Sequence, residues 1–256
     1  MDAASMLYEA DRDLEPIAAF ASSALVSDPY AVQADFFSRR SQRVGSAPAG
    51  YKVALTSPQA QVALGSTEPA SGRFLAVDVV PSGSTIDLAE RFSPILEVEL
   101  IFRVRQDLPL FASLDQVAQG CDVAAGLECP DSRYRNWFGG EFAALALNDL
   151  IADNCLAGFV VVGETWLPAS SLDLPAVTAS LVHDDQVIAS GVATAVMGNP
   201  LLAVVWLSDQ LARNGEILTA GTVVSAGTLT GPVVATRGTT RSEFSDGLGQ
   251  ALVRFV

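Results

Sequence analysis

Histidine is almost missing from this chain, and the one that is present lies in a polar stretch. His183 is in VHDDQ, between two apolar segments, where a surface turn is expected. Ser-His-Asp and Cys-His catalysis, and histidine-rich zinc sites, would all depend on this one residue. The sequence also contains no GxGxxG and no Walker loop. These classes of site are therefore set aside.

Cysteine is scarce as well, and long apolar runs do not occur. Cys121, Cys129 and Cys155 form no CxxC pair or disulfide framework, so reduced, half-buried thiols are expected. No apolar run reaches the roughly 18 residues of a membrane span. The acidic start, MDAASMLYEADRDLEP, lacks a basic-then-apolar signal. We therefore expect a cytoplasmic protein without a membrane span.

Positive charge is the third scarcity. Fifteen basic residues stand against 29 acidic ones, which gives a formal net charge of −14 over 256 residues. Such a chain repels the phosphates of nucleic acids and anionic membranes, so neither is expected as a partner. Half of the residues are hydrophobic, and the length fits one large domain or a main domain with a small lobe.

Lysine occurs only once, and the other fourteen basic residues are all arginine. Lys52 lies in GYKVALTSPQAQ, residues 50–61, next to a glycine and inside an apolar run. A bias toward arginine explains the arginines but not this exception. Either Lys52 has a role that arginine cannot fill, or it is a chance survivor on the surface.

Local patterns divide the chain into a helical start and a mostly β remainder. Residues 1–44 are expected to be helical, since EPIAAFASSALV has apolar residues at helical spacing and Asp28-Pro29 is typical of a helix start. After the small-residue break GSAPAG at 45–50, short apolar runs alternate with turn residues, which predicts strands. Helices are expected at ASLDQVAQ and at GNPLLAVVWLSDQLARNGE, the latter capped by Asn199 and ended by Gly215. The predicted organisation is an α+β fold with a helical region at 1–49 and a catalytic β domain at 50–256.

The stretch ILEVELIF, residues 95–102, places two acids in a strand pattern. Side chains alternate faces on a strand, so Leu96, Val98, Leu100 and Phe102 form one apolar face, and Ile95, Glu97, Glu99 and Ile101 form the other. The two carboxylates then project from one face, with their Cα atoms about 7 Å apart. Like charges there raise each other's pKa unless a divalent cation lies between them, and Mg²⁺ or Mn²⁺ suits oxygen ligands. A solvated acidic stripe on an edge strand is the alternative.

A third acid, Glu128, ends the apolar run VAAGLE and precedes CPDSRY. An acid at the end of a buried strand is well placed for a site, although an ordinary strand-end charge is the alternative. Three acids from two strands can supply a set of metal ligands on one side of the ion and leave room for water and substrate.

Several motifs together resemble one family. They are PYAVQ at 29–33, GYKVALTSPQAQVALG at 50–65, ILEVELIF, GLECPDSRY at 126–134, DLIADN at 149–154, GNPLLAVVWL at 198–207 and GLGQALVRF at 247–255. Their order and spacing resemble the hydratase and decarboxylase branch of the fumarylacetoacetate hydrolase-like superfamily, over most of the chain. This resemblance implies a curled mixed β-sheet roll with a flanking N-terminal helical region, and a homo-oligomer.

The resemblance also implies roles for particular residues. Glu97, Glu99 and Glu128 hold a divalent metal, Mg²⁺ or Mn²⁺, and the family's lysine falls on Lys52, where a compact, titratable ammonium serves catalysis. The substrate is a small 2-oxo acid, chelated through its carboxylate and 2-oxygen.

Other polar residues are weaker candidates. Arg133 and Asp131 match the family's DSR, and Arg133 either holds a substrate carboxylate or ties the turn to Asp131. Ser57 is a substrate contact or, more in keeping with its position, a helix cap. Asp153 matches the family but is open to a structural interpretation. Trp137 and Phe138 line the pocket or pack in the core, the usual fate of aromatic residues.

Three departures from the family concern the surroundings of the site. Cys155, Leu156 and Ala157 follow ADN where the family carries small hydroxyl residues, and Ala54 replaces a glycine. The stretch FGGEFAALALN after Trp137 is longer than expected. These changes leave the metal in place and put the identity of the substrate in question, with a bulkier 2-oxo acid as one outcome.

The first functional hypothesis is a metal-dependent lyase that hydrates 2-hydroxypenta-2,4-dienoate to 4-hydroxy-2-oxopentanoate in aromatic catabolism. A 4-oxalocrotonate-type decarboxylase is the close alternative, because the same metal site serves both reactions. A C–C hydrolase of the superfamily comes third, since His183 is poorly placed for it. A non-catalytic partner subunit of the same fold is the alternative from another class. A pathway aldolase is a partner by analogy only.

Overall fold

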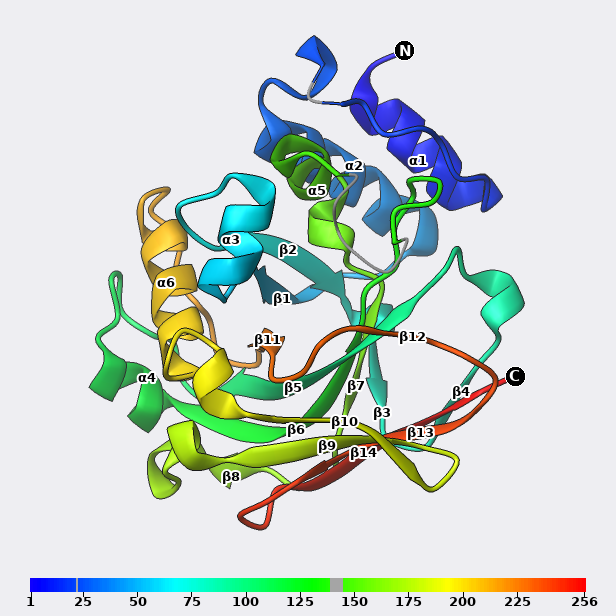
Figure 1. Cartoon of the computed structure of the whole chain (residues 1–256). Coiled ribbons are helices and arrows are strands. Elements are labelled where there is room, and N and C mark those ends of the chain that lie inside the picture. Colours follow the sequence, from blue (N-terminus) through cyan, green and yellow to red (C-terminus); the bar gives the residue numbers. More distant parts are fainter. Residues whose placement is uncertain (22, 139–144) are drawn as a thin grey trace.

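The computed structural model describes residues 1–21, 23–138 and 145–256, and Figure 1 shows how they are arranged. The α-helices of this part of the chain are α1 (Ala3–Asp13), α2 (Pro29–Val44), α3 (Pro58–Leu64), α4 (Leu114–Gly120), α5 (Leu147–Ala152) and α6 (Leu201–Ala212). None of them has the length and apolar character that crossing a bilayer requires.

The described strands form two sheets. The larger one contains β1 (Pro48–Ala54), β2 (Ala70–Leu75), β3 (Val79–Pro81), β5 (Ile95–Val104), β6 (Cys121–Cys129), β7 (Phe159–Val162) and β11 (Val223–Thr228), in the order β2-β1-β11-β5-β6-β7-β3, with β12 (Val233–Val234) on β5 and β8 (Leu167–Pro168) on β6. The smaller one contains β4 (Ser84–Ile86), β9 (Thr178–His183), β10 (Gln186–Val192), β13 (Gly238–Phe244) and β14 (Gly249–Phe255), in the order β10-β9-β13-β14-β4.

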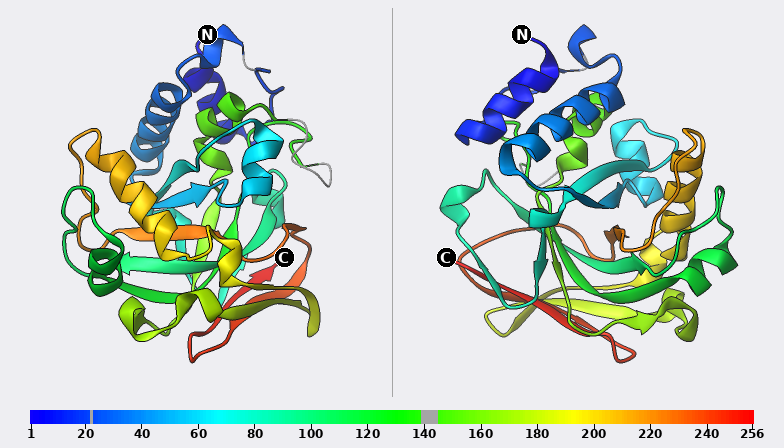
Figure 2. Two further views of the ribbon diagram at one scale, coloured as in Figure 1. Left: turned by 60° about the vertical axis from the view of Figure 1, so that its left-hand side comes forward. Right: turned by 180° about the vertical axis from the view of Figure 1, so that it is seen from behind.

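The larger sheet is mixed, since β1 runs parallel to β11 while β5 and β6 are antiparallel. It curls between the smaller sheet on one side and the helices α1, α2 and α5 on the other, as the views in Figures 1 and 2 agree. The predicted α+β fold with a curled mixed sheet and a flanking N-terminal helical region is confirmed. The exact boundary between residues 49 and 50 stays a prediction.

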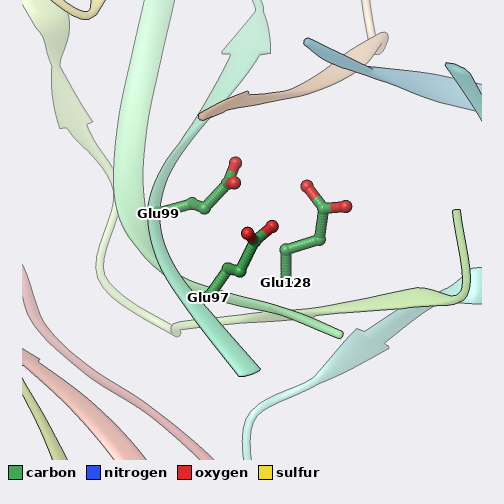
Figure 3. A group of neighbouring side chains, drawn as sticks. All are labelled: Glu97, Glu99 and Glu128. Carbon is green, nitrogen blue, oxygen red and sulfur yellow. The ribbon is translucent and has the colours of Figure 1, made fainter. Parts of the chain in front are cut away.

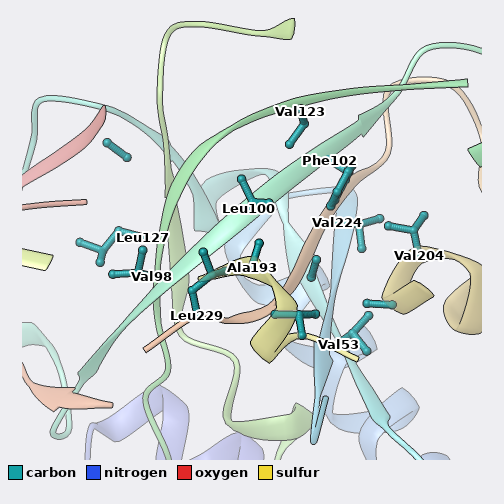
Figure 4. Close-up of a cluster of buried hydrophobic side chains, with 14 of the residues drawn as sticks. Val53, Val98, Leu100, Phe102, Val123, Leu127, Ala193, Val204, Val224 and Leu229 are labelled. Carbon is teal, nitrogen blue, oxygen red and sulfur yellow. The ribbon is translucent and has the colours of Figure 1, made fainter. Parts of the chain in front are cut away.

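The main hydrophobic core lies between the two sheets and against α6. The predicted apolar face of β5 contributes Leu96, Val98, Leu100 and Phe102 to it, and all four are buried. Figure 4 shows part of this cluster, where Val204 of α6 faces the sheet residues Val53 and Val224. Because one face of β5 is committed to this core, its other face is turned toward the helical side of the sheet.

A second hydrophobic cluster joins the N-terminal helices to that other face. Leu7 of α1, Phe36 of α2 and Leu150 of α5 pack together with Ile95 of β5 and with Leu156. Glu97 and Glu99, which follow Ile95 on this face of β5, therefore lie near a largely apolar layer, away from bulk water.

The helix predicted for EPIAAFASSALV is wrong in the described residues. Residues 15–21 and 23 are not helical, and only Ala24–Val26 forms a 3-10 turn. Partners far away in the sequence hold this segment extended: the Ile17 N–H donates to the Arg133 carbonyl at 2.9 Å, and the Phe20 N–H donates to Asp149 Oδ1 at 3.1 Å. These tertiary hydrogen bonds outweigh the local helical spacing.

The helix starting after Asp28 is confirmed, since its carboxylate accepts a hydrogen bond from the Ala31 N–H at 3.1 Å. The helix after Asn199 is also confirmed, but Pro200 is its N-cap and it ends at Ala212, before Gly215. The Asn199 side chain still accepts from the Leu201 N–H at 3.0 Å. Strand β13 lies outside the short apolar runs on which the prediction of strands was based. Its inward face carries the buried hydroxyl residues Thr240 and Ser242 in place of apolar side chains, so it lacks the usual alternation.

Candidate metal centre

Strand pairing brings the three acids together. β5 lies between β11 and β6 in the interior of the larger sheet, and Glu97 is directly opposite Glu128 of β6. Glu97 is 9% exposed, Glu99 is 2% exposed and Glu128 is fully buried. The alternative of a solvated stripe on an edge strand is therefore wrong.

The three carboxylates converge on one point. Each offers an oxygen within 4.8 Å of the others, and Figure 3 shows the side chains turned toward a shared space. Glu128 Oε2 is buried and has no hydrogen-bond partner among the residues that the structure describes, which is costly for a carboxylate oxygen unless a ligand satisfies it. Buried, converging carboxylate oxygens fit a hard divalent cation such as Mg²⁺ or Mn²⁺.

The local electrostatics reflect this crowding. Burial raises the pKa of Glu97 to about 7, opposed by the positive charge of Lys52 and assisted by Glu128. Burial also raises the pKa of Glu99 well above its usual range, and the charges of Glu128 and Glu97 add to the effect. Without a cation, the centre therefore holds protons that a metal has to displace.

Lys52 lies in this centre and not on the surface. It sits on β1, next to Ser225 of β11 in register, and is 4% exposed. Its ammonium forms an ion pair with Glu128. Burial alone would lower the pKa of Lys52, but Glu128, Glu97 and Glu99 raise it above its usual value, so the ammonium stays charged. The alternative of a chance surface lysine is wrong.

Glu99 is held by two donors that the sequence did not reveal. Its Oε2 accepts from Ser225 Oγ at 2.6 Å and from the Gly227 N–H at 2.8 Å. Gly227 has a φ of +112°, and a Cβ there would lie 2.3 Å from Thr56 Oγ1, so only glycine fits. The letters SAGT carry no sign of this contact, because it depends on how β11 pairs with β5.

A cavity of about 280 Å³ opens in front of the carboxylates. Lys52, Glu97 and Glu99 line one part of it, together with Gly227 and Thr228 at the end of β11. Such a volume lies at the small end of ligand pockets and suits a small molecule.

Of the weaker candidates, Ser57 lines the cavity and also caps α3, where its Oγ accepts from the Ala60 N–H at 3.2 Å. Arg133 and Asp131 are outside the cavity lining. Arg133 forms an ion pair with Asp153 and donates to the Ala157 carbonyl at 3.1 Å. The substrate-binding role predicted for Arg133 and Asp131 stays a prediction that this geometry does not favour.

Asp131 and Asp153 organise the chain around the site. Asp131 accepts from the N–H groups of Phe92, at 3.0 Å, and Ser93, at 2.8 Å, just before β5. Asp153 accepts from Ser132 Oγ at 2.7 Å in addition to Arg133. The structural interpretation of Asp153 is therefore the better supported one.

The aromatic, histidine and cysteine candidates lie mostly elsewhere. Trp137 packs in the cluster of the N-terminal helices and does not line the cavity. His183 lies on β9 of the smaller sheet, where its Nδ1 shares a hydrogen bond of 2.8 Å with Thr240 Oγ1. Cys121, Cys129 and Cys155 are free thiols, as expected, but fully buried rather than half-buried.

The unusual residues after ADN do reach the site. Cys155 and Leu156 line the cavity, as does Ala54, whereas Ala157 does not. Asn154, Cys155 and Leu156 all have left-handed φ values, of 56°, 50° and 61°. Three consecutive non-glycine residues in this region are strained, and such strain gathers at functional sites. The expected insertion after Trp137 includes residues 139–144, which lie outside the described residues.

The fold and the three-carboxylate centre define a protein of the fumarylacetoacetate hydrolase-like class. No protein-family model matches the chain. It superimposes on a 4-oxalocrotonate decarboxylase from Pseudomonas putida G7, solved with magnesium and adipate, with a TM-score of 0.88 at 25% identity over 99% of this chain and 95% of that one.

Curated relatives narrow the class. The chain is 33% identical to a 2-keto-4-pentenoate hydratase of Burkholderia vietnamiensis over 82% of its length and 79% of the relative. It is 31% identical to 2-keto-4-pentenoate hydratase 1 of Dechloromonas aromatica over 99% of this chain and 95% of that relative. The chain belongs to the 2-keto-4-pentenoate hydratase family.

Proposed function

We propose that this protein hydrates a small unsaturated 2-hydroxy acid, with 2-hydroxypenta-2,4-dienoate as substrate and 4-hydroxy-2-oxopentanoate as product. The observation that carries the proposal is the convergence of three buried carboxylates beside the only lysine, at the end of a small cavity. Membership of the hydratase family supports the reaction type.

The resident cofactor in this proposal is Mg²⁺ or Mn²⁺, held by Glu97, Glu99 and Glu128. Their converging oxygens fit a hard cation, and so does Glu128 Oε2, which has no partner within the described parts of the chain. When bound, such an ion supplies Lewis-acid stabilisation of the negative charge that develops on a 2-oxo acid.

Residues of the chain itself stabilise the substrate's charge, move its proton and exclude water. Lys52 is assigned to the 2-oxygen of the substrate, where its charged ammonium either stabilises negative charge or donates a proton during ketonisation and regains one from the dienol hydroxyl. Ketonisation moves that proton to the terminal carbon and leaves an enone, to whose far end water then adds. The apolar parts of the cavity wall limit stray water, so that charges within it interact strongly.

The second candidate is decarboxylation of a 4-oxalocrotonate-type acid. The close structural match to a 4-oxalocrotonate decarboxylase favours it, and the same head-group site accepts the electron pair that carbon dioxide leaves behind. A C–C hydrolase has less support, because His183 lies on the smaller sheet, bonded to Thr240.

The test is the ultraviolet absorbance of 2-hydroxypenta-2,4-dienoate incubated with the protein and Mg²⁺, with EDTA as control. The proposal predicts loss of the dienol band, formation of 4-hydroxy-2-oxopentanoate by NMR, and arrest by EDTA. Release of carbon dioxide from 4-oxalocrotonate without dienoate hydration would replace it by the decarboxylase. No turnover of either acid, with no metal binding, would instead indicate the non-catalytic subunit.

Assembly and location complete the proposal. We expect a homo-oligomer located in the cytoplasm, with an aldolase that consumes the product as a partner by analogy only. Light scattering of the purified protein tests the first expectation, since a monomer of 26.8 kDa would contradict it.

A further inference from the structure

Side chains cover the outer edge of the larger sheet, where β2 is the last strand in the described part of the chain. The Ser71 carbonyl accepts from Gln33 Nε2 at 2.9 Å, and the Ser71 N–H donates to the Tyr30 hydroxyl at 3.2 Å. Asn154 does the same for Arg73, because its side chain accepts from the Arg73 N–H and donates to the Arg73 carbonyl, at 2.8 Å each. One amide thus satisfies both backbone groups of a strand residue, as a neighbouring strand would.

Asn154 begins a strained turn. It shares left-handed φ values with Cys155 and Leu156, although asparagine is the one residue of the three that adopts this conformation readily. All three are buried, and Cys155 and Leu156 line the cavity in front of the carboxylates. Such a turn persists only where its surroundings fix it. The bonds from Asn154 to Arg73 anchor its start, and the Leu156 carbonyl, which accepts from the Asp131 N–H at 2.8 Å, anchors its end.

Gly72 brings this turn against Lys52. The two residues are partners in the register of β2 with β1. A Cβ on Gly72 would lie 2.2 Å from the Asn154 carbonyl oxygen and 3.1 Å from Lys52 Cγ. The space that a side chain would fill is therefore occupied from two directions, by the turn and by the stem of the lysine. Because the turn covers this space, the lysine stem does not bend into it, and its ammonium reaches Glu128.

The turn acts on Lys52 by packing and not by charge. Burial raises the pKa of the Cys155 thiol to about 12, and the positive charge of Lys52 opposes the rise. The thiol is therefore neutral at physiological pH, and the side chains of Asn154 and Leu156 carry no charge. A change in the turn consequently alters where the ammonium lies and leaves the charge of its surroundings as it was.

We propose that Asn154 is a positioning residue for Lys52: anchored to the edge of β2, it holds the strained turn over Gly72 and so fixes the lysine ammonium among the carboxylates. Asn154 is not among the residues that line the cavity, so it acts through Lys52 and not by contact with the substrate. The inference rests on the proposed function for its kinetic consequence alone, because Lys52 acts there on the 2-oxygen of the substrate.

The single lysine makes a specific test possible. Protein produced with ¹³C-labelled lysine gives one set of lysine side-chain signals in NMR spectra, and Lys52 is their source. Asn154→Ala is expected to move the Lys52 Cε signal toward that of a solvent-exposed lysine, with Mg²⁺ and without it. Asn148→Ala is the matched control, since Asn148 donates to the Val26 carbonyl at 3.1 Å and does not line the cavity, so the signal stays in place. An unmoved signal in folded Asn154→Ala protein, or the same shift in both variants, would overturn the inference.

Two further variants keep the test decisive if Asn154→Ala does not fold. Asn154→Gly adopts the left-handed backbone without a steric cost and lacks only the amide, so it should move the signal in the same way. Gly72→Ala approaches from the other side, because its methyl group collides with the Asn154 carbonyl and with the stem of Lys52. A wild-type signal in either folded variant would contradict the proposed contact.

The rate of dienoate hydration is the second measurement. Misplacing Lys52 weakens an interaction made in the transition state, so Asn154→Ala is expected to lower kcat about 10- to 100-fold with KM nearly unchanged. A purely structural role would lower stability and leave kcat per folded site as it was, and an unchanged kcat beside a displaced signal would overturn the inference.

These outcomes are separate from the fate of the proposed function, because the NMR measurement needs no turnover. A wild-type protein that leaves the dienoate intact, with a Lys52 signal that Asn154→Ala displaces, would keep the positioning role and lose the hydratase. Hydration by the wild-type protein, with a signal that no variant displaces, would do the reverse.

Discussion

Replacement of Lys52 by methionine tests the electrostatic core of the site. Lys52 forms an ion pair with the fully buried Glu128, and both lie among further carboxylates on the interior of the sheet. Methionine keeps the apolar length of the side chain and removes only the charge, so Glu128 is left buried without its counter-charge. Breaking a buried pair in this way is expected to lower the free energy of unfolding by about 3–5 kcal/mol in metal-free protein.

The same structure predicts that Lys52 and Glu128 are coupled. The double variant Lys52→Met with Glu128→Gln removes both charges together, so its loss is expected to fall below the sum of the two single losses by about 2 kcal/mol or more. Mg²⁺ should restore Lys52→Met, because a cation replaces the missing charge. At 100 times its Kd, binding to the native state alone contributes about 2.7 kcal/mol.

Urea unfolding at pH 8, followed by far-ultraviolet circular dichroism with EDTA or with Mg²⁺, measures all of these quantities. Val62→Met serves as a control, because Val62 is exposed and outside the cavity. Additive losses for the two single variants, or a Lys52→Met protein as stable as the control, would refute the buried pair as the structural basis of the site.

Three further predictions concern the surroundings of the centre. Since the pKa of Glu97 is raised to about 7, a proton occupies Glu97 below that pH, so the affinity for Mg²⁺ measured by calorimetry should increase as the pH rises through about 7, and a pH-independent affinity would contradict it. Ser225→Ala removes a donor to Glu99 and is expected to weaken Mg²⁺ binding 10- to 100-fold, while an unchanged Kd would show that Glu99 needs no such support. Arg133→Met is expected to lower stability by about 3 kcal/mol through the loss of its buried pair with Asp153, and a large rise in KM at unchanged stability would instead favour direct contact with substrate.

Local sequence patterns predicted a residue's position correctly where that position depends on a single strand or helix. The alternation in ILEVELIF placed Glu97 and Glu99 on one face of β5, and the structure has them there, because a committed apolar face fixes the other one. The helix starts after Asp28 and Asn199 were equally local, because each side chain accepts from a nearby backbone N–H. The position of Lys52 could not be predicted from a local pattern, because it depends on how β1 pairs with β11 and β11 with β5. Only the family resemblance pointed to it.

Long-range contacts account for what was missed. EPIAAFASSALV has helical spacing, yet hydrogen bonds to Arg133 and Asp149, more than 100 residues away, hold it extended. Ser225 and Gly227 gain their role only through the register of β11 against β5. Asp131 was expected as the structural partner of Arg133 because the two are close in sequence. The partner is instead Asp153, which the fold brings close.

The most direct test of the account is the rate of dienol loss from 2-hydroxypenta-2,4-dienoate by the Glu128→Gln protein, measured across a titration of Mg²⁺. Glu164→Gln, at an exposed position, removes the same charge as a control, and circular dichroism verifies that both variants are folded. A three-carboxylate centre predicts that Glu128→Gln loses at least about 1,000-fold in kcat/KM, equivalent to about 4 kcal/mol, and that added Mg²⁺ does not restore it. A folded Glu128→Gln protein with the activity of the control would contradict a three-carboxylate metal centre as the site of hydration.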